Sequence, residues 1–314
     1  LPHDPLNSGA LRGLDEASSL AMGGPKHTNA IAESVPDLKM FQEVLTRVRT
    51  WAKARGIYGA KYGYLGGISW CLMSAYLCRH LKDVPEAGKL VRLFFVLYNQ
   101  WNWRELAVAI NPIPPEHGYL VRGRYSPVKI ITPCEPFVNA SSSVTWSHLH
   151  VIKDEFKRAV GIIGNASRDP LADQSIWDEL CKPKTTREVG KEFRFKLDVT
   201  WDEKIDSGFV QSQLVNLTRS IKDQVGCIPM LWPKSIKAQA ASIFLKIAQW
   251  QKERPEKQLI IRPGIDAWYS RHENLKDEHF TYQLGKSRKK KRKRVSESDV
   301  PAPTKRTNVN KKEG

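Results

Sequence analysis

Apolar residues in the first half of the chain recur at helical spacing. Five of them follow Asp37 with the 3–4 spacing of one helix face: Phe41, Val44, Leu45, Val48 and Trp51. This spacing predicts a helix with one buried face. Residues 67–81 are apolar on nearly every side and predict a buried helix, and residues 86–103 and 149–160 show helical spacing again. Residues 1–36 are rich in Pro, Gly, Ser and Asn, so we expect an extended lead-in there.

The second half of the chain has a different pattern. Residues 193–199 alternate apolar and polar side chains, which is typical of a half-buried strand. A helical pattern follows at 208–225. The rest of this half predicts strands at 227–232, 242–250, 258–263 and 279–285. It also predicts a short helix near 264–272. Mixed strands and helices predict a small α+β sandwich.

The two patterns together predict an α+β protein made of a helical domain and a sandwich domain. We expect a boundary near residues 163–172. The expected parts of the chain are a lead-in at 1–9, a helical domain at 10–162, a sandwich domain at 163–285 and a tail at 286–314.

The chain is strongly basic, with a formal net charge of +17. Residues 286–314 carry twelve Lys/Arg against three acidic residues, whereas the other 285 residues carry thirty-eight against thirty. Because the body is basic even without its tail, a phosphate-rich partner such as RNA is expected.

The tail has almost no apolar residues to bury, so we expect it to be disordered. It contains an unbroken basic run: Arg288, Lys289, Lys290, Lys291, Arg292, Lys293 and Arg294. A second basic pair follows at Lys305-Arg306. This pattern predicts a nuclear-localisation signal and hence a nuclear protein, and a nonspecific nucleic-acid tail is an alternative that can hold at the same time.

Other compositional features narrow the class of protein. No run approaches eighteen apolar residues, so we expect no membrane span. The five cysteines show no metal-ligand spacing, which favours a reducing compartment. The first residues lack the pattern of a signal peptide. The chain does not begin with Met, so we interpret it as part of a longer protein.

The segment "YGAKYGYLGGISW" at residues 58–70 holds four glycines and four aromatic residues. Such a loop can be a turn, or it can let a ligand approach the backbone closely. The backbone N–H groups where the next helix begins would favour an anion. Four cations precede the loop: Arg47, Arg49, Lys53 and Arg55. They could hold a phosphate chain, and a solvated helix face is the alternative.

The longer segment "WAKARGIYGAKYGYLGGISW" resembles a segment of eukaryotic nuclear poly(A) polymerases. The likeness extends to "LDE" at 14–16, "VPD" at 35–37, "LVRLFFVLYNQWNW", "IITPCEP" and "IKDEFKRAV". It is strong over residues 10–160 and looser afterwards. The resemblance implies the central domain of that family, followed by its RNA-binding domain with an RRM-like fold.

The resemblance also implies roles for particular residues. Arg49 stands where the family has a Lys that binds the ATP phosphates, and Tyr58 corresponds to its nucleotide-contacting Tyr. Gly67 and Ile68 correspond to its Gly-Val pair. One departure is Ala60, which replaces an Asn of the family and has no hydrogen-bonding side chain. Lys53 and Arg55 are further expected phosphate or RNA contacts.

The family enzymes use ATP as a substrate together with Mg²⁺ or Mn²⁺, in a reaction of the two-metal type. Their metal-binding carboxylates belong to an N-terminal nucleotidyltransferase domain with a Gly-Ser pair and an Asp-x-Asp. This sequence contains neither motif, and Asp15, Asp37 and Asp154 are lone acids that we interpret as caps or surface charges. We therefore expect no metal ligands and no catalysis by this chain alone.

A basic stretch precedes and enters the strand predicted at 193–199. Its expected RNA contacts are Lys182, Lys184, Arg194 and Lys196. Trp201 or Trp268 could stack on RNA bases, although a place in the core is the alternative for each.

Three hypotheses follow from the sequence. The first is a truncated or divergent part of a poly(A) polymerase that binds RNA and part of ATP for mRNA 3′-end polyadenylation. The second is a non-catalytic nuclear RNA-binding or scaffold paralogue without the nucleotidyltransferase domain, which Ala60 favours. The third is a generic basic nuclear protein. The expected partners are RNA (the mRNA 3′ end or poly(A)) and the cleavage and polyadenylation machinery, and we expect a monomer.

Overall fold

A computed structural model describes residues 16–122, 126–164, 169–193, 195–225, 227–247, 265, 266, 268 and 280–286. Within this part the protein is α+β, mostly helical, with one small antiparallel sheet. Several sequence-based predictions lie outside the described residues: Asp15, Arg194, the strand at 258–263 and the basic run 288–294. None of the described helices combines the length and apolar character needed to cross a membrane.

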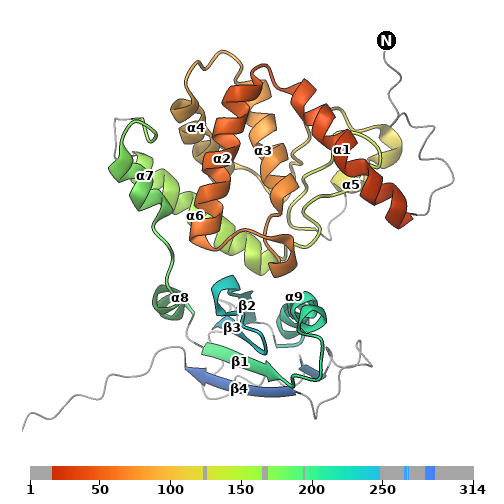
Figure 1. Cartoon of the computed structure of the whole chain (residues 1–314), viewed down its shortest axis with the longest axis vertical. Coiled ribbons are helices and arrows are strands. Elements are labelled where there is room, and N and C mark those ends of the chain that lie inside the picture. Colours follow the sequence, from red (N-terminus) through yellow and green to blue (C-terminus); the bar gives the residue numbers. More distant parts are fainter. Residues whose placement is uncertain are drawn as a thin grey trace, which may run out of the picture.

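The helices of the first half gather into one body (Figure 1). Their bounds are α1 Glu16–Ser34, α2 Leu38–Arg55, α3 Gly67–His80, α4 Ala87–Gln100, α5 Tyr119–Arg122, α6 Trp146–Gly164 and α7 Gln174–Cys181. The helices predicted after Asp37, at 67–81, at 86–103 and at 149–160 are confirmed. The extended lead-in is wrong over Glu16–Ser34, because that segment is helical and packs on α3 with Ile31 buried.

The predicted stripe of α2 forms the centre of the helical core. Asp37 caps the helix by accepting a hydrogen bond from Met40 N, and Gly56 ends it with φ of 72°. Trp51 is fully buried, and its ring centroid lies 4.8 Å from that of Phe95 and 5.5 Å from that of Phe156. Aromatic packing therefore joins α2, α4 and α6.

The sheet follows the predicted alternation. Strands β1 Phe195–Trp201, β2 Cys227–Leu231, β3 Ala240–Ile247 and β4 Phe280–Lys286 are arranged in the order β2-β3-β1-β4, with every neighbouring pair antiparallel. Helix α9 Ser207–Val225 connects β1 to β2, and the short helix α8 Thr186–Glu192 precedes β1. The strands predicted at 193–199, 227–232, 242–250 and 279–285 are thus confirmed where the structure describes them, and so is the helix at 208–225.

The two faces of this sheet are buried against different partners. Alternate residues of β1 share a hydrophobic cluster with α9, namely Phe195, Leu197, Val199 and Trp201. On the other face, Met230 pairs with Phe244, and both belong to the helical core together with Trp232. We call α9, strands β1–β4 and the connection between β2 and β3 (residues 232–239) the sheet unit. Trp201 and Trp268 are only 5% and 1% exposed, so their expected stacking on RNA bases is wrong and the core alternative holds.

Candidate functional site

The glycine-rich loop between α2 and α3 is a tight turn. Gly59 and Gly63 have φ of 117° and 82°, a region that side chains rarely adopt. Gly59 N donates a hydrogen bond of 2.9 Å to Leu65 O, and Tyr58 forms an isolated bridge with Leu65. Two of the four glycines of this loop are therefore explained by backbone conformation alone.

A third glycine brings two predicted site residues together. A Cβ placed on Gly67 would lie 2.6 Å from Arg49 Nη2 and 3.0 Å from Tyr58 Oη. Arg49 and Tyr58 thus converge on the first residue of α3, where the backbone has no side-chain cap from Gly66. The neighbouring Ile68 is 36% exposed and adds an apolar group. The first backbone N–H groups of a helix and a guanidinium at one place favour an anion.

Two cationic side chains, Arg49 and Lys53, lie near the start of α3. Arg49 Nε is buried and makes no hydrogen bond, and Lys53 Nζ lies 5.2 Å from the centroid of the Tyr58 ring. On the next turn of α3, burial raises the pKa of the Cys71 thiol, and the positive charge of Arg49 opposes that shift. We call Arg49, Lys53, Tyr58, Gly67 and Ile68 the loop site.

Arg55 and Lys184 are not at the loop site. Arg55 Nε donates to Glu155 Oε2 at 2.7 Å, and Lys184 Nζ lies 3.3 Å from Glu155 Oε1 and 2.9 Å from Glu192 Oε2. All of these groups except Glu192 are nearly fully buried. The expected phosphate or RNA contact of Arg55 and Lys184 is therefore wrong, because internal carboxylates already neutralise both cations.

The other predicted RNA contacts lie at the surface. Lys182 is exposed and pairs with Glu179 at 3.3 Å, three residues earlier in the chain. Lys196 is on β1 and pairs with Asp198 at 2.7 Å. Exposed pairs of this kind exchange partners at little free-energy cost, so both lysines can still reach a phosphate.

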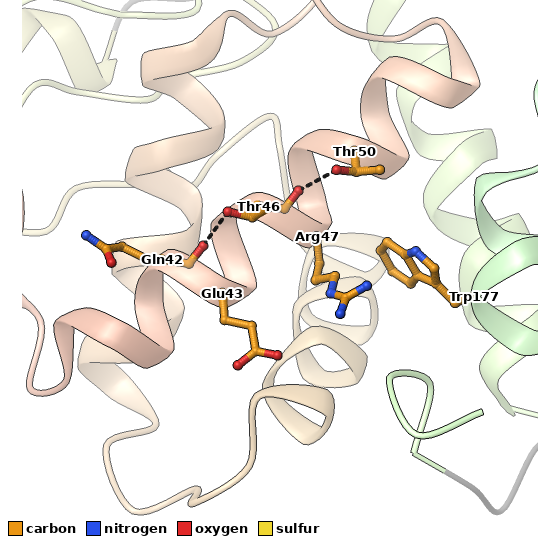
Figure 2. A pocket seen from close by; sticks show the side chains of 6 residues that line it. All are labelled: Gln42, Glu43, Thr46, Arg47, Thr50 and Trp177. Atoms are coloured by element: carbon orange, nitrogen blue, oxygen red, sulfur yellow. Dashed lines mark hydrogen bonds between the residues drawn. The ribbon is translucent and has the colours of Figure 1, made fainter. Parts of the chain in front are cut away.

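Arg47 and Arg49 lie two positions apart in the sequence, but their side chains lie on different sides of α2. Its guanidinium carbon stacks 5.2 Å from the centroid of the Trp177 ring, in a groove between α2 and α7 (Figure 2). The groove is lined by Gln42, Glu43, Thr46, Arg47, Thr50 and Trp177. Residues two apart on a helix point to opposite sides, which the sequence could have indicated.

The two acidic residues of the described part that were singled out, Asp37 and Asp154, have separate structural roles. Asp37 is the cap of α2, and Asp154 lies 3.4 Å from His150 at the surface, so their interpretation as a cap and a surface charge is confirmed. Within the described ranges, no group of three or more His, Cys, Asp or Glu side chains could hold a metal ion. The described residues therefore do not fit the Mg²⁺ or Mn²⁺ of the family reaction.

A family model described as the poly(A) polymerase central domain matches residues 40–183. The chain is a eukaryotic poly(A) polymerase central-domain protein. The predicted resemblance is thereby confirmed. Every residue of the loop site lies inside this central domain, whereas Trp232 and the rest of the sheet unit lie beyond it.

Curated relatives agree with this assignment. Nuclear poly(A) polymerase 1 of Arabidopsis thaliana is 31% identical over 225 residues, which are 68% of this chain and 30% of that protein. Poly(A) polymerase of Entamoeba histolytica is 30% identical over 58% of this chain and 34% of its own length. The chain therefore spans about a third of the length of the curated relatives it matches. A solved cytoplasmic RNA terminal U-transferase aligns over 51% of this chain and 62% of its own at 19% identity, with a TM-score of 0.41.

Proposed function

We propose that this chain binds RNA and part of ATP for mRNA 3′-end polyadenylation, as a portion of a poly(A) polymerase that is not catalytic by itself. The observation that carries the proposal is the convergence of Arg49 and Tyr58 on Gly67 inside the central domain. Arg49 would pair with the nucleotide phosphates, and the bare Gly67 backbone would admit the nucleotide at close range. Ile68 would contact the base. ATP would be the substrate, and Mg²⁺ or Mn²⁺ would be held by carboxylates of the family's N-terminal nucleotidyltransferase domain and not by this chain.

The sheet unit is the proposed RNA-binding part. Its strand order, with α9 connecting the two strands that flank β3, is that of the βαββαβ class and supports an RRM-like fold. We accordingly propose a central domain at 10–162, an RNA-binding domain at 163–285 and a basic tail at 286–314. The tail would direct the chain to the nucleus, where the cleavage and polyadenylation machinery would be its partner.

One observation favours the alternative, a non-catalytic nuclear RNA-binding or scaffold paralogue. Ala60 is exposed on the loop, and its Cβ faces the Gly66 backbone at the start of α3. It offers no hydrogen bond to a base edge. A primer-extension assay with oligo(A), ATP and Mg²⁺ or Mn²⁺ tests the non-catalytic claim, since extension by the pure chain would contradict it.

The nucleotide-binding proposal is tested by two arginines of the same helix. Arg49→Ala should weaken ATP binding about tenfold or more, because a charge-assisted hydrogen bond to phosphate is lost. Arg47→Ala is the matched control and should stay within about twofold, since Arg47 stacks on Trp177. Isothermal titration calorimetry measures both. Equal effects of the two substitutions, or an unchanged affinity in Arg49→Ala, would contradict the assignment of the loop site.

A further inference from the structure

The ring of Trp232 covers the residue at which the glycine loop begins. A Cβ placed on Gly56 would lie 2.5 Å from Trp232 Cη2 and 2.6 Å from its Cζ3, so the indole lies directly against the Gly56 backbone. Trp232 is fully buried and comes immediately after β2. Gly56 has φ of 72° and ends α2, two residues before Tyr58. A residue of the sheet unit therefore touches the turn that leads from Arg49 to Tyr58.

A second contact from the same segment reaches the last turn of α2. Lys234 Nζ donates a hydrogen bond of 3.4 Å to Ala54 O. Lys in this position is favourable, because the carbonyl groups at a helix C-terminus lack intrahelical partners. Trp232 and Lys234 thus hold the end of α2 from one side, while Arg55 is fixed by Glu155 from the other.

The far part of the loop is also held by the sheet unit. The 3₁₀ turn Ala60–Tyr62 lies against α9, and Tyr62 packs against both hydrophobic clusters. From α9, Arg219 Nη2 donates to Ser143 O at 3.2 Å, just before α6. The loop is therefore enclosed between the helical body and the sheet unit, with contacts at its start and in its middle.

We propose that Trp232 is a positioning residue for the loop site. By covering Gly56, its indole fixes the direction in which the chain leaves α2, and with it the place of Tyr58 relative to Arg49. Short loops gain order mainly from such tertiary packing. The sheet unit then completes the nucleotide site besides serving as the proposed RNA-binding part. The functional half of this inference rests on the proposed nucleotide binding, whereas the structural half does not.

The test compares two buried tryptophans of the sheet unit. Trp232→Leu removes the ring from Gly56, and Trp201→Leu is the matched control, because Trp201 is equally buried but faces α9. Trp232→Phe keeps an aromatic ring and serves as the rescue variant. For each protein, hydrogen exchange of residues 56–66, ATP affinity and affinity for oligo(A) are measured well below the melting temperature.

We expect Trp232→Leu to speed exchange of the loop amides at least tenfold and to weaken ATP binding about tenfold. Affinity for oligo(A) should change less than about threefold, and Trp232→Phe should restore most of the ATP affinity. Loop exchange that is the same in Trp232→Leu and Trp201→Leu would overturn the positioning role, whether or not ATP binds. If the wild-type chain binds no ATP, the proposed function fails, and the exchange data alone decide the role of Trp232.

Gly56→Ala gives a second measurement, made first in a protein that keeps Trp232 and then in the Trp232→Leu variant. In the wild-type background its new methyl group collides with the indole, so loop exchange should rise at least tenfold. In the Trp232→Leu background the same change should have a smaller effect, because the collision with the indole is gone and only the cost of a side chain at a φ of 72° remains. Independent, additive effects of the two substitutions would contradict the proposal.

Discussion

At the scale of single residues, His148 makes stability depend on pH. Its ring is fully buried, with the centroid 4.7 Å from that of Tyr64, and Nδ1 lies 2.6 Å from Thr145 Oγ1. Burial, with a smaller contribution from the positive charge of Arg219, lowers the pKa of His148 to about 3. The unfolded chain takes up this proton near pH 6.5 and the folded chain does not. The stabilisation is therefore complete above pH 6.5 and is lost as the pH falls toward 3.

The measurement is urea unfolding at about pH 7.5 and about pH 5, where His148 alone should lower the free energy of unfolding by about 2 kcal/mol. His148→Gln should remove that part of the pH dependence. His150→Gln is the control and should not, because His150 is 44% exposed. A wild-type pH dependence that survives His148→Gln would show that the proton uptake on unfolding belongs to other groups.

The sequence predicted residue roles where a local pattern carried them. Arg49, Tyr58 and Gly67 were singled out by the resemblance to poly(A) polymerases, and they lie on a helix, a glycine loop and the start of the next helix within nineteen residues. The same reasoning failed for Arg55, because its carboxylate partner Glu155 is 100 residues away in the chain. The spacing of residues along a helix predicts the face on which a cation lies. It does not predict which distant side chain will pair with that cation.

At the scale of elements, the buried carboxylate of α6 connects α2 to the segment between α7 and α8. Glu155 contacts Arg55 at 2.7 Å and Lys184 at 3.3 Å, and Arg55 also donates to the carbonyl of Lys182. Removing one charge from such a buried group leaves its partners unpaired. Glu155→Gln should therefore lower the free energy of unfolding by about 3 kcal/mol in urea titration.

Glu179→Gln is the control for this substitution. Glu179 pairs with Arg158 and Lys182, but its side chain is 50% exposed, so the loss should stay below about 0.5 kcal/mol. Comparable losses in the two variants would mean that the buried ion pairs add no more stability than surface pairs do.

Long elements with clear periodicity were predicted, and short or interrupted ones were not. Helices α2, α3, α4, α6 and α9 and all four strands follow their apolar patterns. Helix α1 was missed because Gly24 and Pro25 interrupt its pattern. The short helices α7 and α8 begin at the caps Asp173 and Thr185, and eight and seven residues are too few for a periodic signal.

At the scale of the whole molecule, the helical core contains residues that the sequence assigned to two separate domains. The helical core continues past the expected boundary through Trp177, Leu180 and Phe193, and it includes Trp232 and Phe244 from the sheet unit. Lys234 and Ala54, which are hydrogen-bonded, are 180 positions apart, and no local pattern can indicate such a contact. The sequence predicts that Phe244 lies in a strand. It does not predict that this side of the sheet packs against the helical core.

The net charge of +17 leads to a prediction about RNA binding by the full chain. Each phosphate neutralised by Lys or Arg releases a counterion, so affinity for single-stranded RNA should fall about a hundredfold between about 50 and 200 mM salt. A variant ending at residue 286 loses nearly half of the net charge, so it should bind more weakly with roughly half the salt dependence. Fluorescence anisotropy with labelled oligo(A) and with a mixed-sequence RNA measures both slopes. Lys182 and Lys196 should contact the phosphates of the RNA and not its bases. The two RNAs should therefore show the same slope of affinity against salt concentration. An affinity that does not change with salt would mean that the basic surface is not the RNA-binding surface, and that apolar contacts of the sheet unit hold the RNA.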